Sequence, residues 1–163
     1  MAGMTSLEPV EPKSRHLHIR IDREGQWYYQ NTPMRRGGLV KLFASVLRRG
    51  PDGAYWLVTP TERGLVDVED TPFVITSLHK DSTDRLIFIS NIEEKIVLGT
   101  EHPLRLEDPC GQPRPYILVR EGIEARVLRP VFYQMVALAC AYKGQFGLWS
   151  GGYFAPLCSI EDL

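Results

Sequence analysis

Cysteine is scarce in this chain of 163 residues, and the three cysteines that it has are far apart. Cys110, Cys140 and Cys158 form no CxxC pair, which argues against a disulfide framework and against a closed zinc site. No apolar run approaches the roughly 20 residues that a membrane span needs, and residues 1–15 contain no apolar block of signal-peptide length. We therefore expect a soluble, cytoplasmic protein with no metal site and no membrane partner.

A surplus of charge is absent too. The chain has 19 basic and 20 acidic side chains, which gives a formal net charge of -1. A protein that neutralises many phosphates of a nucleic-acid polymer usually carries a basic surplus, so we expect no such partner. The phosphate-loop patterns GxxxxGKS and GxxxxGKT, the dinucleotide pattern GxGxxG and the nucleophile-elbow pattern GxSxG are missing. The sequence therefore lacks the main signals of three large enzyme classes.

Apolar periodicity predicts two helices. The first has an apolar face made by Leu39, Val40, Phe43, Val46 and Leu47. We expect it to end at Gly50, with Arg48 and Arg49 in its last turn, where positive charge complements the helix dipole. The second begins near Arg129 and runs to Lys143 and Gly144. Because apolar residues cover most of its circumference, we expect it to be the more buried of the two.

Apolar and alternating segments predict strands at 16–21, 27–29, 54–60, 65–68, 73–78, 85–89, 95–98 and 115–120, with a closing hairpin within 144–158. A helix, a glycine and an aromatic strand follow one another in both halves, so that 53–57 matches 144–148. The pattern predicts an α+β fold of two related halves from an internal duplication, each a small antiparallel sheet with one helix. We expect a loose tail at 1–14, an N-terminal half at 15–79 and a C-terminal half at 80–163.

Six segments, in this order, carry a resemblance: PMRRGGLVKLFASVL, DGAYWLVTPTE, VEDTPF, EHPLRL, YILVREGIEA and FGLWSGGYFAPL. Together they resemble the bacterial Domain of Unknown Function 1285 family, from about Trp27 to Pro156. The resemblance implies a duplicated α+β core whose C-terminal half looks like a pleckstrin-homology barrel. It also implies a site for a small, nucleotide-type ligand at the interface of the halves, and a role in signal transduction.

The residues expected at this ligand site are charged, polar or aromatic: Arg36, Glu62, Glu69, Asp70, His102, Arg120, Glu124, Tyr133 and Trp149. Arg36 and Arg120 would hold the anion, because guanidinium groups form strong charge-assisted hydrogen bonds with phosphates and carboxylates. Tyr133 or Trp149 would stack on the ligand. Structural interpretations stand beside these. One of the arginines before the first helix pairs with Glu69 or Asp70, or His102 caps a backbone group in a bend.

Three functions remain open at this stage. The first is a non-enzymatic module for a nucleotide-type or other anionic ligand, with no cofactor and with a signalling protein as a further partner. The second is a protein–protein adaptor that uses a strand edge or an aromatic patch. The third, an enzyme using Glu69, Glu101 and His102, has the least support, because the sequence offers no nucleophile, base and orienting group as a set.

Overall fold

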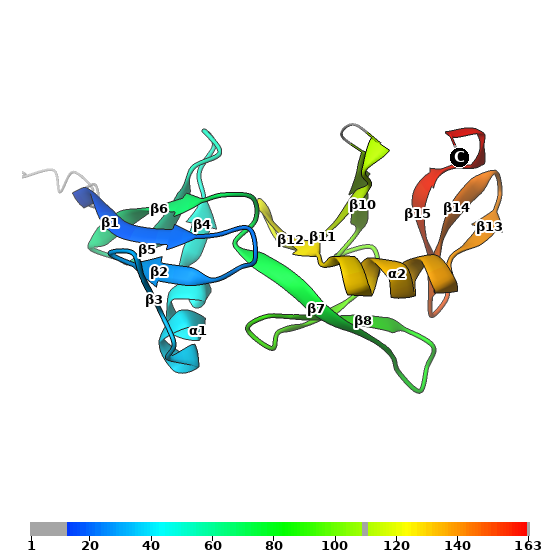
Figure 1. Ribbon diagram of the computed structural model, residues 1–163, viewed down its shortest axis with the longest axis horizontal. Coiled ribbons are helices and arrows are strands. Elements are labelled where there is room, and N and C mark those ends of the chain that lie inside the picture. Colours follow the sequence, from blue (N-terminus) through cyan, green and yellow to red (C-terminus); the bar gives the residue numbers. More distant parts are fainter. Residues whose placement is uncertain (1–12, 109–110, 163) are drawn as a thin grey trace, which may run out of the picture.

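The structure is a computed structural model that describes residues 13–108 and 111–162. Strands form three sheets, arranged in a row along the molecule (Figure 1). The first sheet contains β1 (Lys13–Ile21), β2 (Trp27–Tyr29), β3 (Thr32–Pro33), β4 (Leu47–Arg49), β5 (Tyr55–Val58) and β6 (Glu62–Val68). The second contains β7 (Phe73–Lys80), β8 (Leu86–Ser90), β9 (Lys95–Val97), β10 (Leu104–Glu107), β11 (Arg114–Arg120) and β12 (Ile123–Val127). The third contains β13 (Cys140–Tyr142), β14 (Gln145–Ser150) and β15 (Tyr153–Ser159), and a short 3-10 helix (Ile160–Asp162) follows it.

Each six-stranded sheet is built around a central parallel pair. β1 lies parallel to β6 in the order β3-β2-β1-β6-β5-β4, and β12 lies parallel to β7 in the order β10-β11-β12-β7-β8-β9. Antiparallel hairpins flank both pairs. The expectation of purely antiparallel sheets is therefore wrong. A parallel pair joins strands that are distant in sequence, and local apolar patterns carry no signal of such a pairing.

Two α-helices lie within the described residues, and neither is long and apolar enough to cross a membrane. α1 (Gly37–Ser45) connects β3 to β4 and covers part of the first sheet, and α2 (Arg129–Leu138) lies between the second and third sheets (Figure 1). One continuous apolar core runs through all three sheets and both helices. Its members include Ile21, Trp27, Leu47, Phe73, Phe88, Ile123, Met135, Leu148 and Ala155.

Both helices end earlier than the periodicity predicts. Leu47, Arg48 and Arg49 belong to β4, where Leu47 pairs with Leu57 and is fully buried. The Arg48 guanidinium nevertheless binds carbonyls of Ser45 and Leu47, so it does complement the end of α1. In both cases a strand begins within two residues of the helix end, and its first residue, Leu47 or Cys140, continues the apolar pattern of the helix, so hydrophobic periodicity gives no boundary.

Beyond Leu138 the chain enters β13, so Cys140 lies in a strand and not in α2. The expectation that α2 is the more buried helix is also wrong. Tyr133, Val136 and Leu138 are exposed, and Val131 and Met135 are its buried residues. The apolar surface of α2 is therefore wider than the face that the core covers.

The change from the first sheet to the second comes at residues 69–72, between β6 and β7. The expected boundary between 79 and 80 falls inside β7, which belongs as a whole to the second sheet. The segments 53–57 and 144–148 also differ in position, because β5 lies in a six-stranded sheet and β14 in the three-stranded one. The expected tail lies mostly outside the described residues, as does Cys110, and β1 already begins at Lys13.

Candidate ligand-binding groove

A groove with a volume of about 620 Å³ lies between α1 and the first sheet. We call it the N-terminal groove. Its apolar walls come from β1, β5, β6, α1 and the residue that follows α1: Leu17, Ile19, Leu57, Gly64, Leu39, Phe43 and Val46. Met34 and Pro33 extend the wall where the chain leaves β3. The volume lies in the range that is usual for small-molecule sites.

The local sequence of β1 explains the floor of this groove. Arg15, Leu17 and Ile19 occupy alternate positions and all line it, as the two-residue period of a strand predicts. The pairing of β1 with β6 is interrupted between His16 and Ile19, and the Leu17 side chain packs against Gly64 of β6, whose register partner is Arg15. A Cβ atom at Gly64 would overlap the Leu17 side chain, so the close approach requires glycine.

The rim of the groove is positively charged. Among the lining residues the charged ones are Arg15, Arg35, Arg36 and Glu62, so three arginines and one glutamate give a net charge of +2. Arg15 and Glu62 form an ion pair at 3.2 Å. Arg35 and Arg36 are exposed, and their side chains bind no partner among the described residues. Since nothing in the described part of the chain binds these two guanidinium groups, both are available to an incoming anion.

The chain at the start of α1 adds to this positive potential. Arg36 is the N-cap residue in extended conformation, and the first turn contains no acidic side chain. Gly37 and Gly38 carry no side chain over the first turn, and a Cβ atom at either would meet nothing within 4 Å. The N–H groups of a first helical turn lack intrahelical acceptors and carry partial positive charge.

The nine residues expected at a single site do not come together. Arg36 and Glu62 line the N-terminal groove, whereas the other seven do not. Glu69 pairs with Arg20 at 3.2 Å and accepts the backbone N–H of Arg23 at 3.0 Å. Glu124 binds Arg105 through both carboxylate oxygens, at 3.0 and 3.1 Å. These two carboxylates are committed to arginines of the protein itself.

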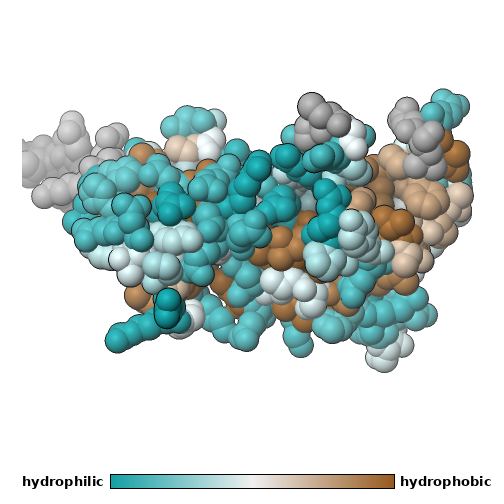
Figure 2. Space-filling model, viewed as in Figure 1, coloured by the Kyte–Doolittle hydropathy of each residue, from teal (hydrophilic) through white to brown (hydrophobic). Residues whose placement is uncertain are grey.

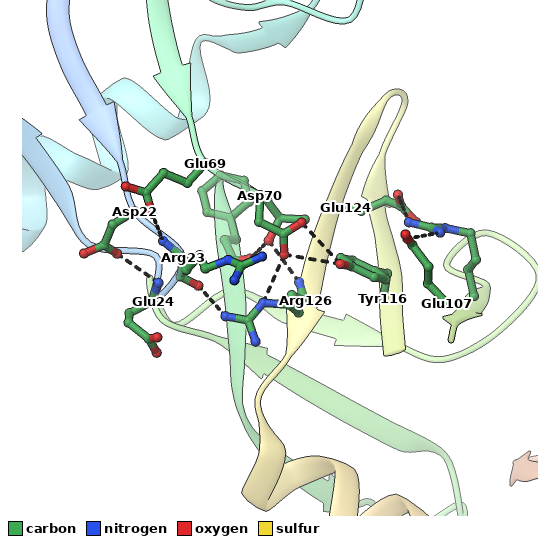
Figure 3. Close-up of polar contacts among 12 residues, drawn as sticks. Asp22, Arg23, Glu24, Glu69, Asp70, Glu107, Tyr116, Glu124 and Arg126 are labelled. Carbon is green, nitrogen blue, oxygen red and sulfur yellow. Dashed lines mark hydrogen bonds and ion pairs between the residues drawn. The ribbon is translucent and has the colours of Figure 1, made fainter. Parts of the chain in front are cut away.

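Asp70 forms the centre of a polar network that joins the two six-stranded sheets (Figure 3). Its carboxylate lies 3.0 Å from Arg126 Nε and accepts the Tyr116 hydroxyl at 3.2 and 3.3 Å. Burial first, and then the charge and hydrogen bond of Asp70, raise the pKa of Tyr116. Arg126 also donates to the carbonyl of Arg23 in the turn after β1. The prediction that Arg35 or Arg36 pairs with Glu69 or Asp70 is wrong, because Arg20 pairs with Glu69 and Arg126 with Asp70.

Arg120 binds the end of α1 rather than facing an open site. Its Nη2 donates to the carbonyls of Ala44 and Leu47, the latter at 3.1 Å. Burial lowers the pKa of Arg120, with Glu94 acting in the opposite direction. This guanidinium therefore links β11 of the second sheet to the helix that borders the N-terminal groove.

His102 lies in the connection between β9 and β10, Tyr133 lies on α2 and Trp149 on β14, and none of the three lines the N-terminal groove. His102 Nδ1 is 2.9 Å from the Leu118 carbonyl, in keeping with the capping interpretation. Tyr133 is 64% exposed on α2. Trp149 packs edge-on against Tyr142 on the third sheet, with ring centroids 4.8 Å apart.

A smaller cavity of about 260 Å³ lies where the first two sheets meet. Trp27 lines it, is 1% exposed, and its indole N–H finds no acceptor among the described residues. Lys41 and Glu93, also in the lining, bind each other at 2.8 Å. The Trp27 indole N–H, which has no acceptor among the described residues, makes this cavity a further candidate for a ligand, with less than half the volume of the N-terminal groove.

Sequence reasoning missed most of the groove, including Arg15, Leu17 and Phe43 as site residues. The alternation of Arg15, Leu17 and Ile19 was the available signal for the floor, because it places a charge at the edge of an apolar strand face. Nothing local indicates that α1 lies opposite this face.

The fold and the groove define a two-part α+β protein whose first part contains a ligand-sized, positively rimmed groove. Two family models cover nearly all of the chain. "Domain of unknown function (DUF1285), N-terminal domain" matches residues 8–71, and "Protein of unknown function (DUF1285), C-terminal domain" matches residues 72–157. The protein belongs to the DUF1285 family, as the sequence resemblance predicts. The two models meet between β6 and β7, where the chain changes sheets.

Two solved structures of the same family are similar to this chain. A DUF1285 family protein from Silicibacter pomeroyi DSS-3 has 36% sequence identity and a TM-score of 0.82, over 93% of this chain and 86% of that one. A DUF1285 family protein from Shewanella baltica OS155 has 26% identity and a TM-score of 0.59, over 73% of this chain and 90% of that one. A search of curated proteins found no match.

Proposed function

We propose that this protein is a non-enzymatic module that binds a small anionic ligand in the N-terminal groove and takes part in signal transduction. The observation that carries the proposal is the pair Arg35 and Arg36, which are exposed at the rim and have no partner among the described residues. A guanidinium can donate two parallel hydrogen bonds to a carboxylate or phosphate, and apolar walls strengthen them. An anion small enough for about 620 Å³ therefore meets both the charge and the shape of the groove.

This proposal moves the ligand away from the contact between the halves, where the family resemblance places a nucleotide-type molecule. The polar groups at that contact bind one another. Arg120 binds Ala44 and Leu47, and Asp70 binds Arg126 and Tyr116. A ligand there would have to displace existing bonds, whereas an anion at Arg35 and Arg36 displaces none among the described residues.

Signalling requires that ligand binding changes the arrangement of the two halves. α1 offers a route, because it borders the groove through Leu39 and Phe43 and is held by Arg120 at its other end. A ligand that binds one position of α1 more tightly than another would shift that equilibrium, and Arg120 would transmit the shift to β11.

A thermal-shift screen tests this function. Nucleotides, nucleotide second messengers, carboxylic acids and inorganic anions are added to the purified protein and to the double variant Arg35→Gln, Arg36→Gln. A ligand at ~100 times its Kd adds ~2.7 kcal/mol to the folded state, which raises the Tm by about 5–10 °C for a chain of this size. We expect a hit that the double variant loses and that Lys95→Gln keeps, since Lys95 is exposed on β9 and outside the groove. A screen without any such hit would contradict the proposal.

A protein–protein adaptor is the second candidate function. Apolar side chains are exposed on α2 and on the third sheet: Tyr133, Val136, Leu138, Tyr142 and Trp149. Figure 2 shows hydrophobic surface at the end of the molecule where β13–β15 lie. A partner that binds the wild type and the double arginine variant equally, but not Tyr133→Ser, Val136→Ser, would favour this function.

We also propose that the two six-stranded sheets arose by duplication of one unit. Both have the same strand order, with the first strand parallel to the sixth and a hairpin on each side, which supports a common origin. In this arrangement the counterpart of β5 is β11. The second sheet followed by α2 is the part for which we propose a pleckstrin-homology-like fold.

A further inference from the structure

The inner surface of the N-terminal groove is apolar along its whole length. The residues that line it at depth are aliphatic or aromatic, and the most buried are Ile19 and Leu57, at 3% and 6% exposure. Its polar lining residues are exposed instead: Arg15, Tyr29, Thr32, Arg35, Arg36, Thr59 and Glu62. Among the described residues, polar side chains are thus available at the rim of the groove but not inside it.

This distribution disfavours a nucleotide and favours an amphiphile. A base and a ribose carry donors and acceptors on several sides, and groups that enter an apolar wall would lose their bonds to water without replacement. An aliphatic chain has no such groups, and its burial is favourable in proportion to the apolar area removed from water.

The shape of the apolar wall points to a linear chain. Along α1 the wall is formed by Leu39, Phe43 and then Val46, which directly follows the helix; the spacings of four and three residues place them on one side. Arg35 and Arg36 precede the helix, so the free charges lie at one end of this wall. From Arg36 to Val46 the helix rises by about 15 Å. An apolar wall with unpaired positive charge at one end matches a molecule with a chain and a single anionic head.

We propose that the N-terminal groove binds a linear aliphatic carboxylate, with the carboxylate at Arg35 and Arg36 and the chain along α1 against Leu17, Phe43 and Leu57. This inference rests on the proposed function, because it names the chemical class of the ligand in the same groove. Paired guanidinium forks match the planar carboxylate group. The chain then contributes affinity without any further polar contact.

Isothermal titration calorimetry with a homologous series tests the inference. Hexanoate, octanoate and decanoate are titrated below their micelle concentrations, beside decanol, decyl phosphate, AMP, ATP and inorganic phosphate. Each two-carbon step buries two further methylenes. At about four-fold per buried methylene, we expect Kd to fall by about 15-fold per step until the chain fills the groove. Decanol, which lacks the charge, should bind at least ten-fold more weakly than decanoate.

Variants of the groove separate the contribution of the carboxylate head to affinity from that of the aliphatic chain. Arg35→Gln, Arg36→Gln should weaken decanoate at least ten-fold and leave decanol unchanged, whereas Lys95→Gln should change neither. Leu39→Trp narrows the groove, so it should weaken decanoate more than hexanoate. Leu42→Trp is the matched control, because Leu42 is on the same helix, 61% exposed and outside the groove. Circular dichroism and the Tm of each variant establish that it folds.

The outcomes are distinct for the two proposals. Binding of AMP or ATP that depends on Arg35 and Arg36, with no alkanoate binding, would overturn the inference and keep the proposed function. Decyl phosphate binding more than ten-fold tighter than decanoate would overturn the carboxylate head. Alkanoate binding that is weakened neither by Arg35→Gln, Arg36→Gln nor by Leu39→Trp would be adventitious hydrophobic binding and would also overturn the inference. Failure of every ligand to bind would overturn both proposals.

Discussion

Replacement of Asp70 by alanine tests whether this carboxylate holds the two sheets together or serves a ligand. The side chains of Asp70 and Arg126 are 20% and 19% exposed, so their ion pair at 3.0 Å is largely shielded from water. The hydroxyl of Tyr116 adds a hydrogen bond to a charged acceptor. We assign about 1.5 kcal/mol to each contact, and expect Asp70→Ala to lower the free energy of unfolding by about 3 kcal/mol.

Urea denaturation measures this loss, and a double-mutant cycle with Arg126→Ala isolates the pair. We expect a coupling energy of about 1–2 kcal/mol between Asp70 and Arg126. Asp67→Ala is the control, because Asp67 pairs with His16 at 2.9 Å on an exposed surface and should cost under about 0.5 kcal/mol. If Asp70→Ala costs no more than Asp67→Ala, or if the coupling is zero, the structural role argued for this network is wrong.

Three further predictions concern the stability of the protein at acid pH, the floor of the groove at Gly64, and the different roles of Arg120 and Arg36. Hydrogen bonds from the turn 83–85 lower the pKa of Asp81 from 3.8 to about 2. The ionised carboxylate therefore stabilises the fold above pH 4, and this contribution is lost as the pH falls towards 2. In the Asp81→Asn variant, the free energy of unfolding should change less between pH 4 and pH 2 than it does in the wild type. Gly64→Ala should push Leu17 into the groove, lowering the unfolding free energy by about 1–3 kcal/mol and weakening any groove ligand, as calorimetry will measure. Arg120→Met removes two hydrogen bonds to carbonyls and should cost about 2–3 kcal/mol in urea titrations, whereas Arg36→Gln, which breaks no contact among the described residues, should cost under about 0.5 kcal/mol. Equal losses for the two arginine variants would contradict their assigned roles.

Local sequence patterns predict most of the strands because alternation is a property of a few neighbouring residues. The strand expected at 16–21 is β1, and that at 73–78 is β7. The end of α1 escapes prediction because Leu47 satisfies two patterns at once. It continues the apolar face of the helix and also begins β4 opposite Leu57. Tertiary pairing decides between them, and no local signal reports it.

The candidate site is predicted much less well than the fold. Arg36 is predicted as an anion-binding arginine directly before a helix, Glu62 is predicted from the family resemblance, and both line the groove. Arg120 and Asp70 look equally suitable in sequence, but three-dimensional packing gives each of them partners within the protein. Whether an arginine is free or committed depends on contacts between distant segments, and composition and spacing do not contain that information.

The central claim is that a ligand binds in the groove inside the first half. The most direct measurement is a two-dimensional NMR titration of ¹⁵N-labelled protein with decanoate. We predict chemical-shift changes concentrated at 15–19, 33–46 and 57–64, which border the groove. Changes concentrated around Trp27, Asp70 and Arg120, or on α2, with the groove residues unmoved, would contradict the account.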